Sequence, residues 1–207
     1  MPESTAQLRQ RLEGLNLYLV GMMGSGKSTA GRHLAEALAY RFLDADAALE
    51  QAAGRSIPSL FAEEGEAGFR QLEAAVLNQI ASWHSLVVAT GGGVVTRPEN
   101  WGQLHQGVVI WLDAPEALLL QRLQADPTPR PLLAGPDPAG RLAELLESRR
   151  PLYGQADLHI VQDGRSPELV AQQVIEALPG ILKQRPGLPE GTFQVRDADG
   201  GLRRSIN

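Results

Sequence analysis

The sequence predicts an α/β fold in which a mainly parallel sheet carries helices on both faces. Two observations support this class. Short apolar runs alternate along the chain with longer segments of helical periodicity. The first apolar run leads directly into a glycine-rich loop and then a helix, an order typical of such sheets. A length of 207 residues suits a single domain of this kind.

The elements follow from the pattern of apolar, glycine and proline residues. Strands are expected over residues 15–20, 41–46, 86–89, 108–112 and 157–162. Helices are expected over residues 28–39, 56–82 with a break near Gly65 and Gly68, from about residue 115, and over 139–150 and 167–178. Residues 126–139 are rich in proline and form a loop. Because parallel sheets bind ligands at the carboxyl ends of their strands, the loops there are the candidate site.

Composition excludes several classes of function. The net charge is -5 and the chain contains no cysteine, so no basic field attracts nucleic acid and no disulfide or thiolate metal site is expected. No apolar run reaches the roughly 18 residues of a membrane span. The polar segment 1–14 lacks the apolar region of a signal peptide and is interpreted as an extension, which predicts a cytoplasmic location. Residues 15–182 are expected to form the domain, and residues 183–207 a mobile tail in which Phe193 and Val195 could pack.

The strongest motif is the stretch from Gly21 to Ser28, which fits the P-loop pattern G-x4-G-K-[ST]. Its glycines allow backbone N–H groups to surround a polyphosphate, and the following helix adds its positive end. The pattern predicts binding of a nucleoside triphosphate with Mg²⁺, in which the lysine contacts phosphate and the serine hydroxyl contacts the metal. The expected nucleotide-binding residues of this loop are Gly24, Ser25, Gly26, Lys27, Ser28 and Thr29.

An acidic residue at another strand end should complete the magnesium site, and two positions compete for this role. Asp44 and Asp46 end the segment FLDAD, where an extended backbone would point both carboxylates to one side. Such a pair is costly unless a cation or a substrate hydroxyl uses it. Asp113 follows the fourth apolar run but precedes Ala114 and Pro115, so it is interpreted as a helix cap.

A resemblance to a known family covers residues 15–178. The segments GMMGSGKST, FLDAD, IPSLFAEEGEAGFRQLE, VVATGGGVV, RPLLAGPD and ESRRPLYGQAD occur in this order and together resemble the shikimate kinase family. The resemblance implies a three-layer P-loop kinase fold of the nucleoside-monophosphate-kinase type, with a five-stranded parallel sheet and a mobile lid at about residues 126–139. It also implies ATP-dependent phosphorylation of the 3-hydroxyl of shikimate, a step of aromatic amino-acid biosynthesis.

The resemblance assigns roles to individual residues. Arg70 and Arg149 match the arginines that clamp the shikimate carboxylate, and Glu73 matches the glutamate that orients the first of them. Asp46 matches the aspartate that binds the reacting hydroxyl and accepts its proton, while Asp44 would hold Mg²⁺ through water. The remaining expected contacts are Gly91, Gly92 and Gly93 with the ring, Arg130 of the lid with the transferred phosphate, and Arg122 and Arg165 with adenine. Arg150 is expected to face solvent.

Three alternatives stay open from sequence alone. Another small-metabolite kinase of the same fold, such as a gluconate kinase, would keep the P-loop but need not combine Asp46, Arg70, the glycine triplet 91–93 and Arg149. A non-catalytic relative that binds a partner is disfavoured because Lys27 and these residues are all present. A nucleotide switch is disfavoured because no DxxG motif follows the third strand. The expected ligands are shikimate and ATP, with no nucleic acid or membrane partner, and a monomer is expected.

Overall fold

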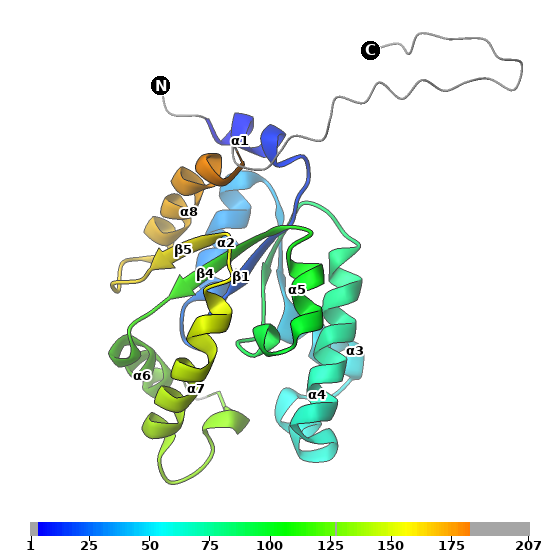
Figure 1. The fold of residues 1–207 in the computed structure, drawn as a ribbon, viewed down its shortest axis with the longest axis vertical. Coiled ribbons are helices and arrows are strands. Elements are labelled where there is room, and N and C mark those ends of the chain that lie inside the picture. Colours follow the sequence, from blue (N-terminus) through cyan, green and yellow to red (C-terminus); the bar gives the residue numbers. More distant parts are fainter. Residues whose placement is uncertain (1–3, 127, 183–207) are drawn as a thin grey trace, which may run out of the picture.

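The computed structural model describes residues 4–126 and 128–182, in which a central sheet lies between two layers of helices (Figure 1). Its strands are β1 (Leu17–Val20), β2 (Arg41–Asp44), β3 (Leu86–Ala89), β4 (Val108–Asp113) and β5 (Leu158–Val161). They are ordered β2-β3-β1-β4-β5, and every neighbouring pair is parallel. The predicted parallel sheet is therefore confirmed, with the P-loop strand at its centre.

Alternating side chains of β1 enter two separate cores. Leu17 and Leu19 pack on one face of the sheet, whereas Tyr18 and Val20 pack on the other. The first core is completed by α1 (Thr5–Leu12), α2 (Lys27–Leu38) and α8 (Pro167–Leu182). The second is completed by α4 (Ile57–Ala81), α5 (Pro98–Leu104) and the end of α7 (Pro138–Tyr153). Burial on both faces explains why this strand is apolar throughout.

The turn after β1 requires glycine for steric reasons. Gly21 has a φ of 141°, and a Cβ there would lie 2.5 Å from the carbonyl oxygen of Leu112. Gly26, with a φ of 86°, is the N-cap of α2. Only glycine adopts such angles without strain. The chain therefore turns sharply between the sheet and α2, and the first turn of that helix faces the carboxyl ends of the strands.

The second strand is shorter than predicted. It ends at Asp44, and α3 (Ala45–Ala53) begins at the next residue. The Asp44 carboxylate caps α3 by accepting hydrogen bonds from the backbone N–H groups of Asp46 and Ala47. The expectation that Asp44 and Asp46 share one extended segment was wrong, because a helix starts between them. Both side chains nevertheless line the same cavity at this edge of the sheet.

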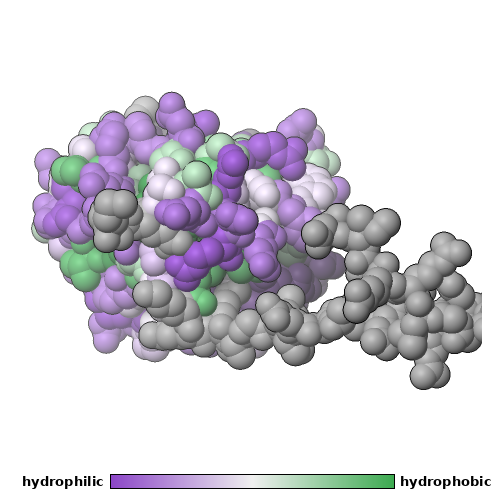
Figure 2. All heavy atoms as spheres, turned by 90° about the horizontal axis from the view of Figure 1, so that it is seen from above, coloured by the Kyte–Doolittle hydropathy of each residue, from purple (hydrophilic) through white to green (hydrophobic). Residues whose placement is uncertain are grey.

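Two further helices were not predicted, while one predicted break is present. Helix α1 lies within the segment interpreted as an extension, and α5 follows β3. The break in α4 occurs at Gly65, whose φ is 67° and ψ is -179°, whereas Gly68 is not part of the break. Figure 1 places α1 at the end of the molecule opposite α6 and the N-terminal part of α7. Seen from above, the α1 end presents mainly hydrophilic residues with scattered apolar ones (Figure 2).

Two features were expected to bear on location and partners, namely a membrane-spanning helix and the C-terminal tail. Within residues 4–126 and 128–182, no helix combines the length and the apolar composition needed to cross a membrane. The tail of residues 183–207, with Phe193 and Val195, lies outside the described residues.

Candidate active site

The P-loop places Lys27 at the N-terminus of α2. The Lys27 ammonium donates hydrogen bonds to the carbonyl oxygens of Gly21 at 2.8 Å and Met22 at 2.9 Å. Burial lowers the pKa of Lys27 to about 8, although the carboxylates of Asp46 and Asp44 oppose this shift. The charge is thus poorly solvated and stabilised by two carbonyls, an arrangement that favours an incoming anion.

A hydroxyl and a carboxylate meet beside the loop. The Ser28 hydroxyl donates to Asp44 at 2.7 Å, so two oxygen-bearing groups converge where a P-loop metal would bind. No group of three or more His, Cys, Asp or Glu side chains that could hold a metal occurs among the described residues. This sparse oxygen set fits Mg²⁺, which is usually held by one or two protein oxygens together with phosphate and water.

Two cavities open at the carboxyl edge of the sheet and share a wall. One, of about 370 Å³, is lined by the P-loop and by Arg122 and Pro167. The other, of about 630 Å³, is lined by α4 and by the segment after β3, together with Arg149. The residues common to both cavities are Met23, Ser28, Asp44, Asp46, Gly92 and Arg130. A group bound in one cavity can therefore reach a group bound in the other.

In the larger cavity, Arg70 is held by two glutamates of its own helix. It donates to Glu73 at 2.8 Å and to Glu66 at 3.3 Å. Arg70 and Glu73 are both buried, and burial raises the pKa of Glu73 while Arg70 opposes the shift. The Arg70 Nε finds no hydrogen-bond partner in the described part of the chain. A Cβ on Gly93 would overlap this guanidinium, so the glycine makes room for it.

Arg149 faces the same cavity from α7. Only 3% of the residue is exposed, and one terminal nitrogen has no hydrogen-bond partner among residues 4–126 and 128–182. The neighbouring Tyr153 hydroxyl donates a short hydrogen bond to the carbonyl oxygen of Gly92. Burial raises the pKa of Tyr153 to about 12, although the Arg149 charge opposes the shift. The cavity thus contains two buried guanidinium groups with unused donors, which suits a carboxylate.

Asp46 lies between the two cavities. Burial and the adjacent Asp44 carboxylate raise its pKa, while Lys27 and Arg130 lower it. A carboxyl group held in such opposing fields is typical of a site that handles a proton. Its position on the shared wall brings it within reach of ligands on both sides.

The segment expected as the lid joins α6 (Glu116–Ala125) to α7 and contains a short 3₁₀ turn at Pro131–Leu133. Arg130 binds Asp126 at 2.6 Å. Hydrogen bonds from Thr128, with that from Arg130, lower the pKa of Asp126 to about 2.

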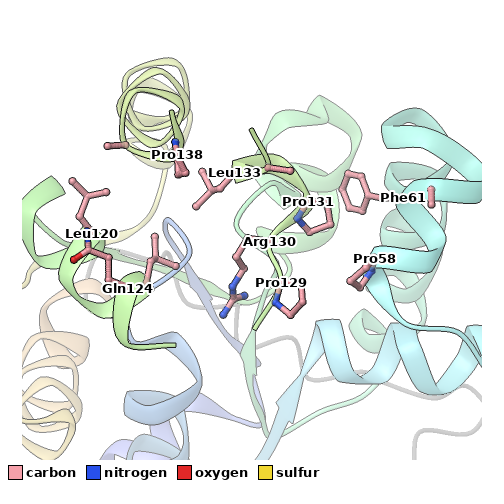
Figure 3. A pocket seen from close by; sticks show the side chains of 13 residues that line it. Pro58, Phe61, Leu120, Gln124, Pro129, Arg130, Pro131, Leu133 and Pro138 are labelled. Atoms are coloured by element: carbon pink, nitrogen blue, oxygen red, sulfur yellow. The ribbon is translucent and has the colours of Figure 1, made fainter. Parts of the chain in front are cut away.

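A third cavity of about 890 Å³ separates this segment from α4 (Figure 3). Pro58 and Phe61 of α4 face Pro129 and Pro131 across it, whereas the Arg130 side chain points away from α4.

The two arginines expected at adenine differ in position. Arg122 donates to the carbonyl oxygen of Gly24 at 3.0 Å and lines the smaller cavity. Arg165 instead forms an ion pair with Asp163, and within the described residues it lines neither of the two shared cavities. The structure therefore brings Arg122, but not Arg165, to the wall of the smaller cavity.

Asp113 does not cap a helix, so that interpretation was wrong. Helix α6 starts at Glu116 with Pro115 at its N-cap, two residues beyond this carboxylate. Asp113 instead accepts a hydrogen bond from Arg150 at 3.0 Å, and His159 lies 3.1 Å from the same oxygen. Arg150 is partly exposed as expected, but its charge is paired.

Sequence reasoning did not single out Tyr153 and Asp126. Tyr153 ends the quoted segment SRRPLY, where its spacing of four residues from Arg149 places both on one helix face. Asp126 precedes Arg130 by four residues, a spacing typical of helical ion pairs, but the intervening prolines disfavoured a helix there. Met23 of the P-loop also lines both cavities.

The fold and the site define the class of protein, a P-loop kinase with two joined cavities at the carboxyl edge of its sheet. A gluconokinase from Sinorhizobium meliloti 1021 has the same fold, with a TM-score of 0.52 at 20% identity, covering 82% of this chain and 93% of that chain. The shikimate kinase family model matches residues 23–179. The chain belongs to the shikimate kinase family and is therefore an enzyme that phosphorylates shikimate with ATP.

Close relatives and solved structures agree with this assignment. A shikimate kinase from Synechococcus sp. (strain RCC307) is 64% identical over 185 residues, covering 89% of this chain and 94% of the relative. One from Nostoc punctiforme is 56% identical, covering 83% and 95%. The structure of shikimate kinase from Acinetobacter baumannii in complex with shikimate has a TM-score of 0.80 and 41% identity, covering 84% of this chain and 97% of that one.

Proposed function

We propose that this site transfers the γ-phosphoryl group of ATP to the 3-hydroxyl of shikimate, using the residues that surround the two joined cavities. The observation that carries the assignment is the pair of buried guanidinium groups, Arg70 and Arg149, on the wall of the acceptor cavity. Each has a nitrogen without a hydrogen-bond partner in the described residues. Shikimate carries one carboxylate, whose two oxygens suit such donors.

On the acceptor side, the two arginines clamp the carboxylate while Asp46 binds the ring hydroxyls. Glu73 fixes the orientation of Arg70, which supports its role as a rigid donor. The segment Gly91–Gly93 lines the cavity without side chains and lets the ring approach the backbone. The complex of the Acinetobacter baumannii relative with shikimate supports a ligand of this size and polarity in the corresponding fold.

On the donor side, the backbone of Gly24–Thr29 and the Lys27 ammonium bind the phosphates. Ser28 and, through water, Asp44 would hold Mg²⁺, which supplies neutralisation of phosphate charge when bound. Arg122 is proposed to contact adenine, supported by its place beside the P-loop. Arg165 is proposed for the same surface, although its ion pair with Asp163 must then open.

During transfer, the bond between the 3-oxygen and the γ-phosphorus forms as the bond to the β-phosphate oxygen breaks, giving ADP. Asp46 holds the attacking hydroxyl and accepts its proton. Lys27 and Arg130 stabilise negative charge on the phosphoryl group, for which Arg130 leaves Asp126 as the lid closes. Holding both substrates in line contributes up to roughly 7–11 kcal/mol of the barrier reduction.

Steady-state kinetics of Arg149→Ala and Arg70→Lys test this assignment. Each change should raise the KM for shikimate at least about 30-fold, while the KM for ATP stays unchanged. Arg149→Ala removes one partner of the buried carboxylate, and Arg70→Lys replaces a planar two-donor group with a single ammonium. Arg141→Ala is the matched control, since Arg141 lies on α7 in an exposed ion pair with Glu144. An unchanged KM for shikimate in both site variants would exclude the clamp. We also expect a monomer, which analytical ultracentrifugation measures.

A further inference from the structure

Helix α7 contains a proline close to Arg149, the arginine proposed to clamp the acceptor carboxylate. Pro151 lies inside this helix, two positions after Arg149. Proline has no N–H to donate to the carbonyl of Glu147, and its ring crowds that carbonyl. The last turn of α7 is therefore held less firmly by its own backbone, and the direction of the Arg149 side chain depends on contacts outside the helix.

The first outside contact is on the cavity side. The Tyr153 hydroxyl donates to the Gly92 carbonyl, and the Tyr153 ring stacks on Trp111 of β4 with centroids 5.8 Å apart. Tyr153 is fully buried. This contact fixes how closely the end of α7 approaches the sheet.

The second outside contact is at the end of β4. Asp113 accepts a hydrogen bond from Arg150 at 3.0 Å, and the same oxygen lies 3.1 Å from Nε2 of His159. The Asp113 side chain is only 11% exposed, so its charge has lost most of its hydration and depends on these partners. The His159 ring stacks on Trp111 with centroids 4.1 Å apart and holds its own position. The acceptor oxygen for Arg150 is thus fixed by the sheet.

We infer that Asp113 is a positioning residue for acceptor binding. Consecutive residues on a helix point about 100° apart, so fixing Arg150 toward the end of β4 sets the rotation of the turn that carries Arg149. Asp113 thereby directs the Arg149 guanidinium into the acceptor cavity without touching the acceptor. The inference rests on the proposed clamp role of Arg149. It assigns Asp113 a role in acceptor affinity rather than in nucleotide binding.

The test compares Asp113→Asn, Arg150→Ala, their double variant and Arg150→Lys with Arg141→Ala as the matched control. Asp113→Asn and Arg150→Ala should each raise the KM for shikimate about tenfold, the size of coupling expected between contacting groups, while the KM for ATP changes less than about twofold. The KM for shikimate of the double variant should be no higher than that of the poorer single variant, because both single changes remove the same contact between Asp113 and Arg150. Arg150→Lys should recover part of the affinity, since it keeps the charge.

Arg149→Ala, measured in parallel, separates the two claims. If it raises the KM for shikimate while the Asp113 and Arg150 variants leave it unchanged, the positioning role is overturned and the clamp stands. If Arg149→Ala has no effect, the clamp itself fails. Thermal unfolding distinguishes a purely structural contribution: a fall in Tm with equal changes in both KM values would also overturn the inference.

Discussion

At the scale of single residues, the larger cavity depends on the fit between the Arg70 guanidinium and Gly93. Gly93 has a φ of -100°, an angle open to any residue, so its backbone does not require glycine. The requirement comes from Arg70, whose guanidinium occupies the volume that a Cβ would take. Glycine here determines the position of a neighbouring charge rather than the path of the chain.

Gly93→Ala should therefore displace Arg70 and raise the KM for shikimate about tenfold or more, with little change in the KM for ATP. The control is Gly102→Ala in α5, where, apart from the adjacent residues and backbone of α5 itself, no atom of the described residues lies within 4 Å of a Cβ. That change should leave both KM values unaltered and stabilise the protein by about 0.5–1 kcal/mol. Equal kinetics for the two variants would contradict the account of Gly93.

At the scale of elements, the lid segment and α4 present matching apolar surfaces. Phe61 stacks on the buried Phe69, with ring centroids 4.4 Å apart, and faces Pro131 across the cavity of Figure 3. Arg130 lies between two prolines of this segment, so docking of the prolines on Phe61 would carry Arg130 toward the transferred phosphate. Pro127, one of the five prolines, lies outside the described residues.

Phe61→Ala should lower kcat about tenfold by removing this docking surface, whereas Phe61→Leu should retain most of the activity. Hydrogen exchange of residues 128–139, with an ATP analogue and shikimate, should show protection in the wild type and less in Phe61→Ala. Unchanged exchange on adding both ligands to the wild type would contradict closure of the lid.

The elements also show where sequence reasoning succeeded and where it could not. The P-loop was predictable because glycine spacing, lysine and the flanking apolar run act within one local segment. Helix α3 was missed because it starts immediately after a strand, with Asp44 ending one element and capping the next. Helix α1 has a capping box of Ser4 and Gln7 and apolar residues four apart, a signal that could have been used.

At the scale of the whole molecule, the positions of the residues around the larger cavity follow from long-range packing that no local pattern contains. The family resemblance named Arg70 and Arg149, yet their shared cavity depends on α4 and α7 flanking β3 and β4. The role of Asp113 was mispredicted for the same reason, since its partners Arg150 and His159 come from α7 and β5. The local sequence favoured a helix cap at Asp113, whereas in the folded structure this carboxylate forms an ion pair with Arg150.

The whole fold also predicts a response to alkaline pH. Burial raises the pKa of all three tyrosines, Tyr18, Tyr40 and Tyr153, and that of Tyr153 to about 12. A folded-state pKa above the unfolded value contributes stability that is complete below about pH 10 and is lost as pH rises toward 12. Tyrosinate absorbance should therefore appear together with loss of helical circular dichroism. Tyrosines that ionise near pH 10 in a folded protein would contradict this burial.

The central claim is that the two joined cavities select shikimate as the acceptor for phosphate from ATP. The most direct measurement is ADP release by the wild-type protein with shikimate, quinate or gluconate as the acceptor. We predict rapid release with shikimate and little above the background ATPase rate with the others, because analogues leave buried polar groups of the site unpaired. Release that does not depend on shikimate, or that is equally fast with gluconate, would contradict the account.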